Sequence, residues 1–333
     1  MPALDHLLAR LVQCLVLCAT VSAYKARAGP SYEVIRARLE PRWLSQCAKP
    51  LRSDACCRAW EAKVKRHFNL LAETYSAASK YHFVHLEALN KTTESYDIFE
   101  PTWNCESLER VPWQFGDGPK LVCGVDVLGA RRSCLVYSVG SNGHVDFEKG
   151  IKSRAPNCEI HTWDPYLNAR ELKILHAAQA DGTLTYHDAG LIGDDGVALL
   201  PKGRDSRKVI PSKNFTAFVD DLGHRARTID ILKVDIEGGE FTAFAHTGLL
   251  GKCLEGGAPT VPIRQVHLEI HGVEPLPIFQ LFEMFFDCGY ALVSKEPNHW
   301  GCKGVECGEF SLVSPEHAWD EFVLTHPSCA AAA

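Results

Sequence analysis

The chain has 333 residues, which is enough for two ordinary domains or for one large α/β domain. Its 46% hydrophobic and 23% charged residues are typical of a globular protein and argue against long disordered regions. The 35 Lys and Arg residues against 41 Asp and Glu residues give a net charge of −6, so no basic surplus indicates a nucleic-acid partner. The one strongly apolar run lies at the N-terminus, which excludes a protein with several membrane spans.

That apolar run covers residues 11–21 and is too short for the ~20 residues that cross a bilayer. Val21 and Ala23 are small residues at the positions that signal peptidase requires. We therefore expect residues 1–23 to be a cleaved signal peptide and the mature protein to be secreted or to reside in the lumen of the secretory pathway, with no stable membrane span. The alternatives are an uncleaved membrane anchor and an N-terminal core helix.

The cysteine count agrees with that compartment. Of 14 cysteines, Cys14 and Cys18 lie in the apolar run, which leaves 12 in the mature chain. An even, high count after a signal peptide predicts structural disulfides, and the chain contains no Cys-x-x-Cys pair typical of a zinc site. Two sequons, at Asn90 and Asn214, give slight support to a secreted glycoprotein.

Two regions differ in their patterns. Residues 24–118 lack strand alternation, so we expect a mainly helical extension with a helix within residues 53–72, held by Cys47, Cys56, Cys57 and Cys105. It could serve as a lid or as a partner surface. The Gly116–Pro119 turn predicts a boundary, after which residues 119–329 form an α/β domain.

In this second region, short apolar runs alternate with helical stretches, which is the pattern of βαβ units. We expect strands at 135–139, 159–163, 183–186, 229–236 and 266–270, and helices at 167–180, 215–222, from 240, and at 276–288. Residues 290–294 and 309–313 predict two more strands with no helix between them, which suits an antiparallel hairpin at the edge of a parallel sheet. The whole pattern is typical of the Rossmann-like methyltransferase sheet.

A nucleoside ligand is predicted at the carboxyl ends of the first strands. The first strand ends in Gly140-Ser141-Asn142-Gly143, where glycines permit close approach to the backbone, and Asp164 ends the second strand, where a carboxylate can accept bonds from ribose hydroxyls. Asp188, after the third strand, could bind an adenine amine. The plain alternatives are an Asp-Pro turn at Asp164 and a solvated acid at Asp188. A nicotinamide cofactor is the rival ligand, but the third glycine of its fingerprint is missing.

Acidic and imidazole groups follow the next two strands. Asp235 and Glu237 alternate at the end of the fourth strand, where they could orient or deprotonate an acceptor, or cap the next helix. His267, Glu269 and His271 alternate along the fifth strand. A metal site formed with an acid from the fourth strand remains open, but Glu269 and His271 also fit an acceptor pocket, and we expect no metal.

These motifs together resemble the methyltransferase-like protein 24 family, which is similar to the FkbM-type methyltransferases. The likeness covers roughly residues 119–313 and rests on the segments 136–143, 164–165, 232–238 and 267–271. It implies a class I fold and S-adenosylmethionine as donor, with Gly140 and Gly143 beside the donor and Asp164 on its ribose. It also implies that Asp235 and Glu237 border the acceptor, and it favours an oxygen acceptor without naming one.

The sequence thus predicts an S-adenosylmethionine-dependent methyltransferase, with Asp235, Glu237 and His271, in that order, as candidate general bases. The acceptor is undetermined and could be a small molecule, a glycan or a protein. The alternatives are a secreted glycoprotein that has kept the fold without turnover and a dinucleotide-dependent oxidoreductase.

Overall fold

The structure is a computed structural model, and it describes residues 32–48, 53–80, 99–113, 116–192, 211–245, 261–272, 275–300, 302 and 307–330. The chain divides into two units, residues 1–38 and 39–333, and the first contributes only the beginning of helix α2 (Tyr32–Leu44) to the described part. The predicted signal peptide and the Asn90 sequon lie outside the described residues. Within those residues, no helix is both long enough and apolar enough to cross a membrane.

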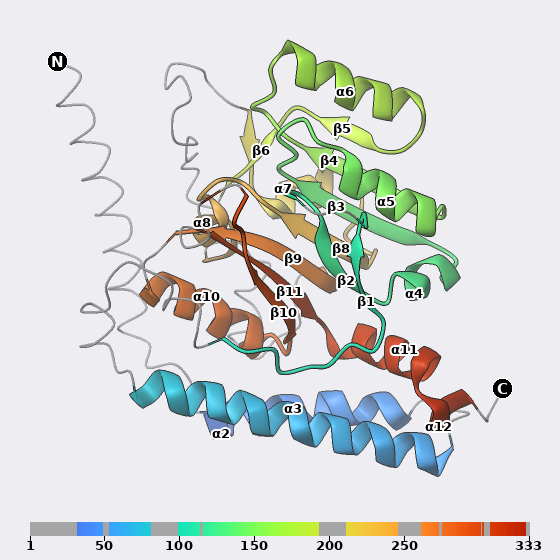
Figure 1. The fold of residues 1–333 in the computed structure, drawn as a ribbon, viewed down its shortest axis with the longest axis vertical. Helices are drawn as coiled ribbons and strands as arrows, with labels where there is room; N and C mark the ends of the chain where they lie inside the picture. The colour runs from blue at the N-terminus through green and yellow to red at the C-terminus, as the bar shows by residue number, and fades with distance from the viewer. Residues whose placement is uncertain are drawn as a thin grey trace. The chain divides into compact units, whose positions relative to one another are not determined.

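A seven-stranded sheet forms the centre of the second unit, in the order β10-β11-β9-β8-β3-β4-β5 (Figure 1). Its parallel strands are β3 (Cys134–Val139), β4 (Cys158–Trp163), β5 (Thr185–His187), β8 (Ile229–Val234) and β9 (Ile263–His271). Strand β11 (Cys307–Val313) runs antiparallel to both β9 and β10 (Ala291–Pro297). This arrangement confirms the predicted Rossmann-like methyltransferase sheet with a terminal antiparallel hairpin.

Helices cover both faces of the sheet, which explains why its strands read as continuous apolar runs. On one face, buried side chains of α4 (Val125–Ala130), α5 (Asp146–Arg154) and α6 (Ala169–Ala180) share a core with Val136 and Ile160. On the other face, Phe218 of α7 (Phe215–Asp221) stacks on Trp163, and Phe282 of α10 (Pro275–Asp287) contacts Phe310. The short helix α8 (Glu240–Ala245) follows β8.

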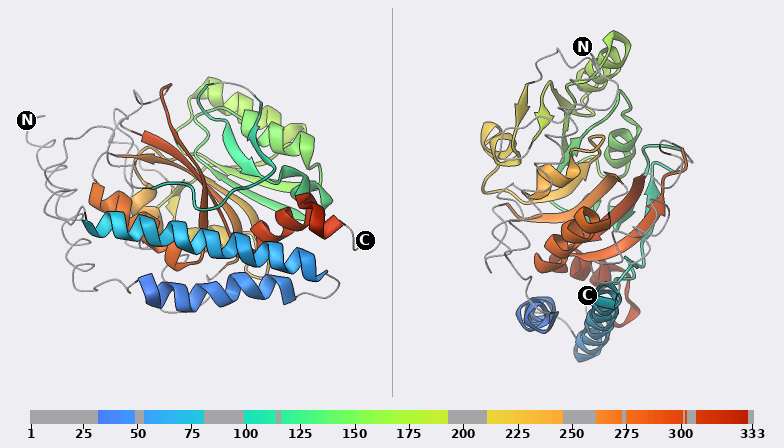
Figure 2. Two further views of the ribbon diagram at one scale, coloured as in Figure 1. Left: turned by 60° about the horizontal axis from the view of Figure 1, so that its bottom comes forward. Right: turned by 90° about the vertical axis from the view of Figure 1, so that its left-hand side faces the viewer.

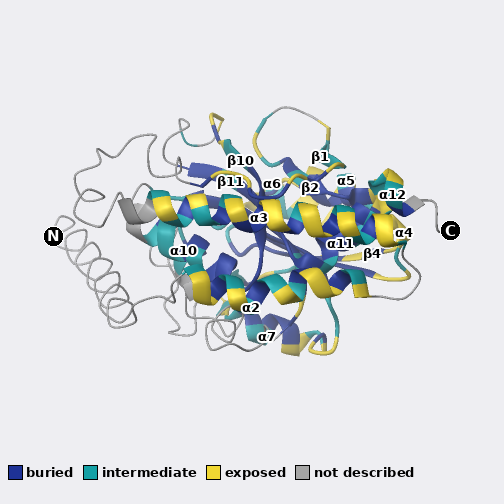
Figure 3. Ribbon diagram, turned by 90° about the horizontal axis from the view of Figure 1, so that it is seen from below, coloured by how far each residue is buried: buried dark blue, intermediate teal, exposed yellow. Residues whose placement is uncertain are grey.

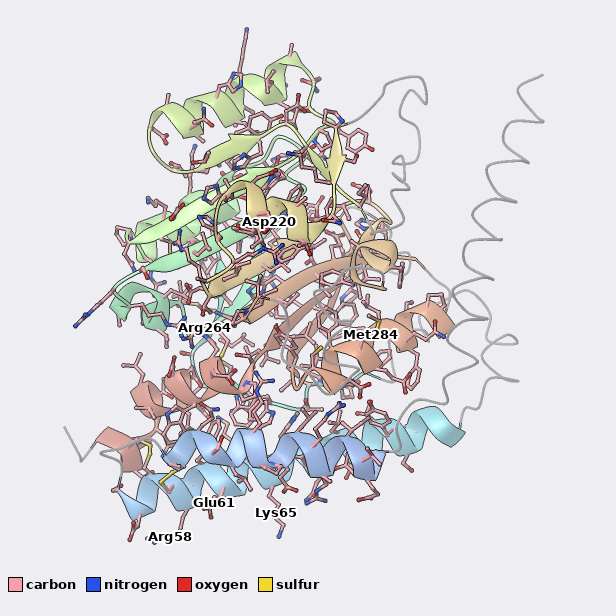
Figure 4. The ribbon with its side chains drawn as sticks, turned by 180° about the vertical axis from the view of Figure 1, so that it is seen from behind. Arg58, Glu61, Lys65, Asp220, Arg264 and Met284 are labelled. Atoms are coloured by element: carbon pink, nitrogen blue, oxygen red, sulfur yellow. A yellow bond between two sulfur atoms is a disulfide. The ribbon has the colours of Figure 1, made fainter. Side chains whose placement is uncertain are left out.

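Helix α3 (Asp54–Lys80) confirms the helix predicted within residues 53–72 and extends beyond it. Trp60, Val64 and Phe68 are fully buried at helical spacing, while the opposite face is exposed (Figure 3). Arg58, Glu61 and Lys65 point away from the rest of the domain on that exposed face (Figure 4). The helix thus covers the domain with one apolar stripe.

A tryptophan cluster and a disulfide attach α3 to the C-terminal helices α11 (Pro315–Thr325) and α12 (Pro327–Ala330), which lie beside it (Figure 2). The Trp60 ring lies 5.9 Å from that of Trp43 and 5.0 Å from that of Trp319. Cys56 is bonded to Cys329 across 273 residues. The predicted extension therefore packs directly on the α/β domain.

Five disulfides join cysteines of the described part, which confirms that the cysteines pair rather than form thiol clusters. Besides Cys56–Cys329 they are Cys47–Cys57, Cys105–Cys123, Cys134–Cys158 and Cys302–Cys307. Cys47 lies in the short helix η1 (Ser45–Ala48). The four cysteines predicted to hold the extension all take part.

One strand was missed in the region expected to be helical. Residues Leu108–Val111 form β1, which pairs antiparallel with β2 (Lys120–Cys123). The Gly116–Pro119 turn joins these two paired strands, and the domain boundary placed there stays a prediction. Two-residue strands β6 (Gly190–Leu191) and β7 (Ser212–Lys213) form a small separate pair.

Candidate active site

The loop after β3 is fixed by two glycines that no other residue could replace. Gly140 has φ 82°, and a Cβ there would lie 1.6 Å from the carbonyl oxygen of Asp235. Gly143 has φ 80°, and a Cβ there would lie 2.3 Å from the side chain of Glu171 in α6. The glycines therefore admit the neighbouring backbone and helix, and the ligand access that the sequence predicted there stays a prediction.

Asp164 braces that loop from the end of the neighbouring strand. Its Oδ2 accepts hydrogen bonds from the amides of Ser141 and Asn142 at 2.9 and 2.7 Å and from the Ser141 hydroxyl at 3.1 Å. Its Oδ1 accepts from the Tyr166 amide at 2.9 Å. The side chain is buried, and these donors stabilise its charge. The structure thus brings together the loop and the carboxylate that the sequence predicted as one site.

A cavity of about 430 Å³ lies at the carboxyl ends of β4 and β5, and the residues that line it include neither the loop 140–143 nor Asp164. Ten described residues line the cavity: Trp163, Tyr186, His187, Asp188, Ala189, Pro211, Lys213, Phe218, Asp221 and Leu222. The Tyr186 hydroxyl donates to the carbonyl oxygen of Asp164 at 2.8 Å, which joins the cavity wall to the loop.

The walls of the cavity are aromatic and mostly uncharged. Trp163 stacks between His187 and Phe218, with ring centroids 4.7 and 4.6 Å away. Burial, together with the neighbouring His161, lowers the pKa of His187 to about 4, so its ring is neutral at pH 7. Burial and the charge of Asp188 raise the pKa of Tyr186 to about 12. The stacked rings can hold a flat aromatic base, and Asp188 and Asp221 offer carboxylates at the wall beside Lys213, so the residues present suit the adenosyl part of S-adenosylmethionine.

Asp235 lies on the other side of Gly140, between two lysines. Its Oδ2 is 3.4 Å from Nζ of Lys120 and 3.8 Å from Nζ of Lys233, which also donates to the carbonyl oxygen of Gly140. Burial alone would raise the pKa of Asp235, but Lys120 and then Lys233 lower it to about 2. The Asp235 carboxylate is therefore ionised at any physiological pH, and its side chain remains 19% exposed.

Glu269, unlike Asp235, is uncharged at neutral pH. It lies 3.5 Å from Lys120 Nζ through Oε2, and the Asn298 amide donates to its Oε1 at 2.7 Å. Burial and the charges of Asp235 and Glu309 raise its pKa to about 9, so it is protonated at neutral pH. Lys120, only 2% exposed in its side chain, thus stands among three carboxyl groups, of which Asp235 holds a fixed negative charge.

His271 is the cation at the mouth of this group. Its Nδ1–H donates to Glu240 at 3.1 Å, and its Nε2 lies 3.5 Å from Glu237 and 3.6 Å from Glu269. Burial opposes its charge, but Glu240 above all, with Asp235 and Glu269, raises its pKa to about 10. An imidazolium with that pKa donates hydrogen bonds at neutral pH and does not accept a proton.

Glu237 differs from its predicted position. Strand β8 ends at Val234, so the alternation expected through residue 236 does not hold, and Glu237 takes a left-handed conformation with φ 59°. Its side chain is 57% exposed and faces His271, while Asp235 faces the lysines. The two acids border the same mouth from different directions.

His267 does not share a site with Glu269 and His271, although all three were predicted along one strand. It is fully buried, its Nδ1 bonds the Ser311 hydroxyl at 3.0 Å, and burial lowers its pKa to about 3. Glu269 and His271 instead have ligand atoms within 4.8 Å of the sulfurs of Cys302 and Cys307. Because those sulfurs form a disulfide, they offer no thiolate to a metal ion.

Sequence reasoning missed Lys120, Glu309 and Asn298, which hold Asp235 and Glu269. They come from the missed β2 strand, from β11 and from the loop after β10. Lys233 lies in the motif 232–238, but the sequence predicted no function for it. No local pattern marks the other three, because their partners lie far away in the chain.

Comparison with known proteins agrees with this architecture. The family described as a methyltransferase domain matches residues 60–314. No curated protein matches the chain.

Solved structures that resemble the chain are distant from it. The match to a fibrillarin/Nop5p complex covers 55% of this chain and 74% of the chain in that structure, with 9% sequence identity and a TM-score of 0.30. Precorrin-6y C5,15-methyltransferase from Geobacter metallireducens GS-15 covers 57% and 83%, with 13% identity and a TM-score of 0.31. The 16S rRNA methyltransferase KamB covers 62% and 100%, with 13% identity and a TM-score of 0.31.

Proposed function

Because the chain belongs to the methyltransferase-domain family, we propose that it transfers a methyl group from S-adenosylmethionine to a hydroxyl acceptor in the secretory pathway. The observation that carries this proposal is the junction at Gly140. There the loop braced by Asp164 meets the backbone of Asp235, so that a donor site and an acid-lined mouth share one wall. The family supports methyl transfer, and the site supports the finer choice of donor and acceptor.

For the donor, the proposal uses the loop 140–143, Asp164 and Asp188. When bound there, S-adenosylmethionine would supply an electrophilic methyl group. Asp164 keeps one lone-pair direction on Oδ1 beyond its bond to the Tyr166 amide, and Asp188 is exposed at the cavity wall. These groups can accept hydrogen bonds from ribose and adenine while the braced loop keeps the backbone in place.

For the acceptor, the ionised Asp235 carboxylate is the proton acceptor. A carboxylate with a pKa of about 2 is a weak base toward a free hydroxyl. The hydroxyl proton becomes strongly acidic as its oxygen takes up the methyl group, however, and a carboxylate then suffices. Glu237, whose pKa burial raises, is the exposed route for that proton to solvent, and the protonated His271 orients the acceptor by donation.

The oxidising compartment is supported by the disulfides. Cys56–Cys329 and Cys105–Cys123 join the helical extension to the α/β domain, and such cross-links persist outside the reducing cytosol. The signal peptide at residues 1–23 and glycosylation at Asn90 and Asn214 belong to the same proposal.

A radiolabelled methyl-transfer screen tests it. Purified protein is incubated with labelled S-adenosylmethionine and with glycan, lipid, small-molecule and protein acceptors, beside the variants Asp164→Ala and Asp235→Ala. We expect label in an ether-linked methyl group, lost in both variants. Donor binding without any transfer would favour a non-catalytic glycoprotein, and saturable binding of a nicotinamide dinucleotide instead would favour an oxidoreductase.

A further inference from the structure

Two tryptophans are exposed where an ordinary fold would bury them. Trp113 is 85% and Trp300 71% exposed, the highest values among the large hydrophobic side chains of the described residues. Tryptophan is costly to leave in water, and exposed aromatic groups mark binding sites more often than single aliphatic ones do. The other described tryptophans that this structure places in its core, such as Trp60 and Trp163, are almost fully buried.

Both exposed tryptophans lie in segments that are bonded to the acid-lined mouth, and we call these two segments its rim. Trp113 follows Val111 of β1 by two residues, and Val111 pairs with Lys120, whose Nζ stands among the carboxyl groups. Trp300 donates its backbone amide to the Asn298 side chain at 2.9 Å, and Asn298 in turn donates to the buried Glu269 at 2.7 Å. Trp300 is thus two residues from a side chain that bonds the cluster, and Trp113 is two residues from the strand partner of Lys120.

The two segments that carry the tryptophans are also tied to each other. The Asn298 amide donates to Asp117 at 2.9 Å, and the Arg110 guanidinium donates to Glu296. The first bond joins the turn after β1 to the loop after β10, and the second joins the two strands themselves. Trp113 and Trp300 are therefore presented on one connected rim rather than on two independent loops.

We propose that this rim and the mouth behind it bind a sugar ring, and that the methyl acceptor is one of its hydroxyl groups. This inference rests on the proposed methyl transfer and names its substrate class. The electron-rich face of an indole packs against the weakly positive C–H face of a pyranose. The carboxylates of Asp235 and Glu237 and the imidazolium of His271 provide acceptors and a donor for the hydroxyls at the ring edge.

The charge of the mouth favours a sugar hydroxyl over an amine. A primary amine is protonated at neutral pH and must lose that proton before it can attack a methyl group. Lys120, Lys233 and the protonated His271 lie beside Asp235 and Glu237, so the mouth offers an ammonium group no net electrostatic attraction. A neutral hydroxyl carries no such penalty: its oxygen would bond the methyl carbon as the methyl–sulfur bond of the donor breaks, its proton would pass to Asp235 and then to solvent, and S-adenosylhomocysteine would leave.

The test measures sugar binding and methyl transfer separately. Probes are methyl α-mannopyranoside, methyl β-galactopyranoside and methyl β-N-acetylglucosaminide, with a lysine peptide as the amine acceptor. Binding is followed by saturation-transfer NMR without the donor, and transfer with labelled S-adenosylmethionine. The variants are Trp113→Ala and Trp300→Ala. Leu324→Ala is the matched control, because Leu324 is 56% exposed on α11 and belongs to no part of the rim.

We expect at least one glycoside to bind and to be methylated, and each tryptophan variant to raise its KM roughly 10-fold or more while kcat changes less than 2-fold and the melting temperature is unchanged. Leu324→Ala should match wild type. Methylation of the lysine peptide with no glycoside bound would overturn the sugar inference and leave methyl transfer standing. Glycoside binding that depends on the tryptophans, with no methyl transfer, would support the sugar site and overturn the proposed function.

Discussion

The two sides of Gly140 are held in place by different kinds of force. On the proposed donor side, Asp164 accepts four hydrogen bonds, three of them from backbone amides, and the local glycines admit the closely packed chain. On the proposed acceptor side, Lys120 lies among three carboxyl groups and is itself almost fully buried. The first side is held by backbone hydrogen bonds and close packing, and the second by interactions among buried charged groups.

The difference teaches which perturbations each side tolerates. A backbone loop fails when a side chain is added where none fits. A buried charge cluster fails when one partner is removed, because the remaining charges lose their compensation. It also responds to pH, because its groups titrate as a unit.

The largest effect is expected from Gly140→Ala. The new Cβ would stand 1.6 Å from the Asp235 carbonyl oxygen, so the junction between β3 and β8 must open, and we expect a loss of more than about 4 kcal/mol or no folded protein. Gly182→Ala is the matched control, since Gly182 has a similar φ of 79° but no atom within 4 Å of the added Cβ. It should cost about 1 kcal/mol in thermal unfolding. Equal losses in both variants would mean that backbone strain alone matters at Gly140.

Removing the central cation comes next. Lys120→Met leaves Asp235 and Glu309 without their closest positive charge, so we expect a loss of about 3–5 kcal/mol in denaturant unfolding. It should also raise the pKa of Asp235 from about 2 and shift the acidic limb of the rate profile to higher pH. Lys295→Met is the control: Lys295 pairs with Glu100, which is 70% exposed, and its loss should cost less than about 1 kcal/mol. An unshifted acidic limb in Lys120→Met would contradict this account of Asp235.

A smaller effect is expected from Asp164→Asn. The amide keeps the shape of the carboxylate but brings a donor toward the amides of Ser141 and Asn142, so we expect a loss of about 1–3 kcal/mol in unfolding. Donor affinity should fall roughly 10- to 100-fold by calorimetry. Asp188→Asn, at an exposed position with no such bonds to the loop, should leave stability unchanged within error. Unaltered donor affinity in Asp164→Asn would remove Asp164 from the donor site.

The smallest effect is a slope with pH. The folded pKa of His271 is about 10 against an ordinary value of 6.5, so its stabilising contribution is complete below about pH 6.5 and is lost as pH rises through 10. The raised pKa of Glu269, about 9, gives the same sign. We therefore expect melting temperature to fall between pH 7 and 10, and His271→Gln to flatten that fall. Wild-type stability that is flat or rising over this range would contradict the charge states assigned to the mouth.

Much of the donor side was predictable because its determinants are local. The runs Leu135–Val139 and Glu159–Trp163 lie within the observed β3 and β4, and parallel pairing brings the residues after them to one edge. Gly140 and Asp164 then meet without further information. Only the reason for the glycines needed coordinates, because the oxygen that excludes a Cβ at Gly140 belongs to Asp235.

The acceptor side was predictable only in part, because its groups meet through tertiary contacts. Asp235, Glu237 and His271 could be named from strand ends, but their charge states depend on Lys120, Glu240 and Glu309. Lys120 lies in β2, directly after the Gly116–Pro119 turn, where no strand was predicted, since a four-residue strand has too little alternation to be distinguished from a loop. Strand β8 also ends earlier than its apolar run, which moved Glu237 away from Asp235.

The central claim is that the loop 140–143 and Asp164 together hold an adenosyl group. Titration calorimetry of S-adenosylmethionine into the purified, disulfide-bonded chain tests it directly, with Asp164→Asn in parallel. One molecule of donor should bind per chain, and the heat should be largely lost in the variant. An absence of binding to wild type, or binding of equal affinity to both proteins, would contradict it.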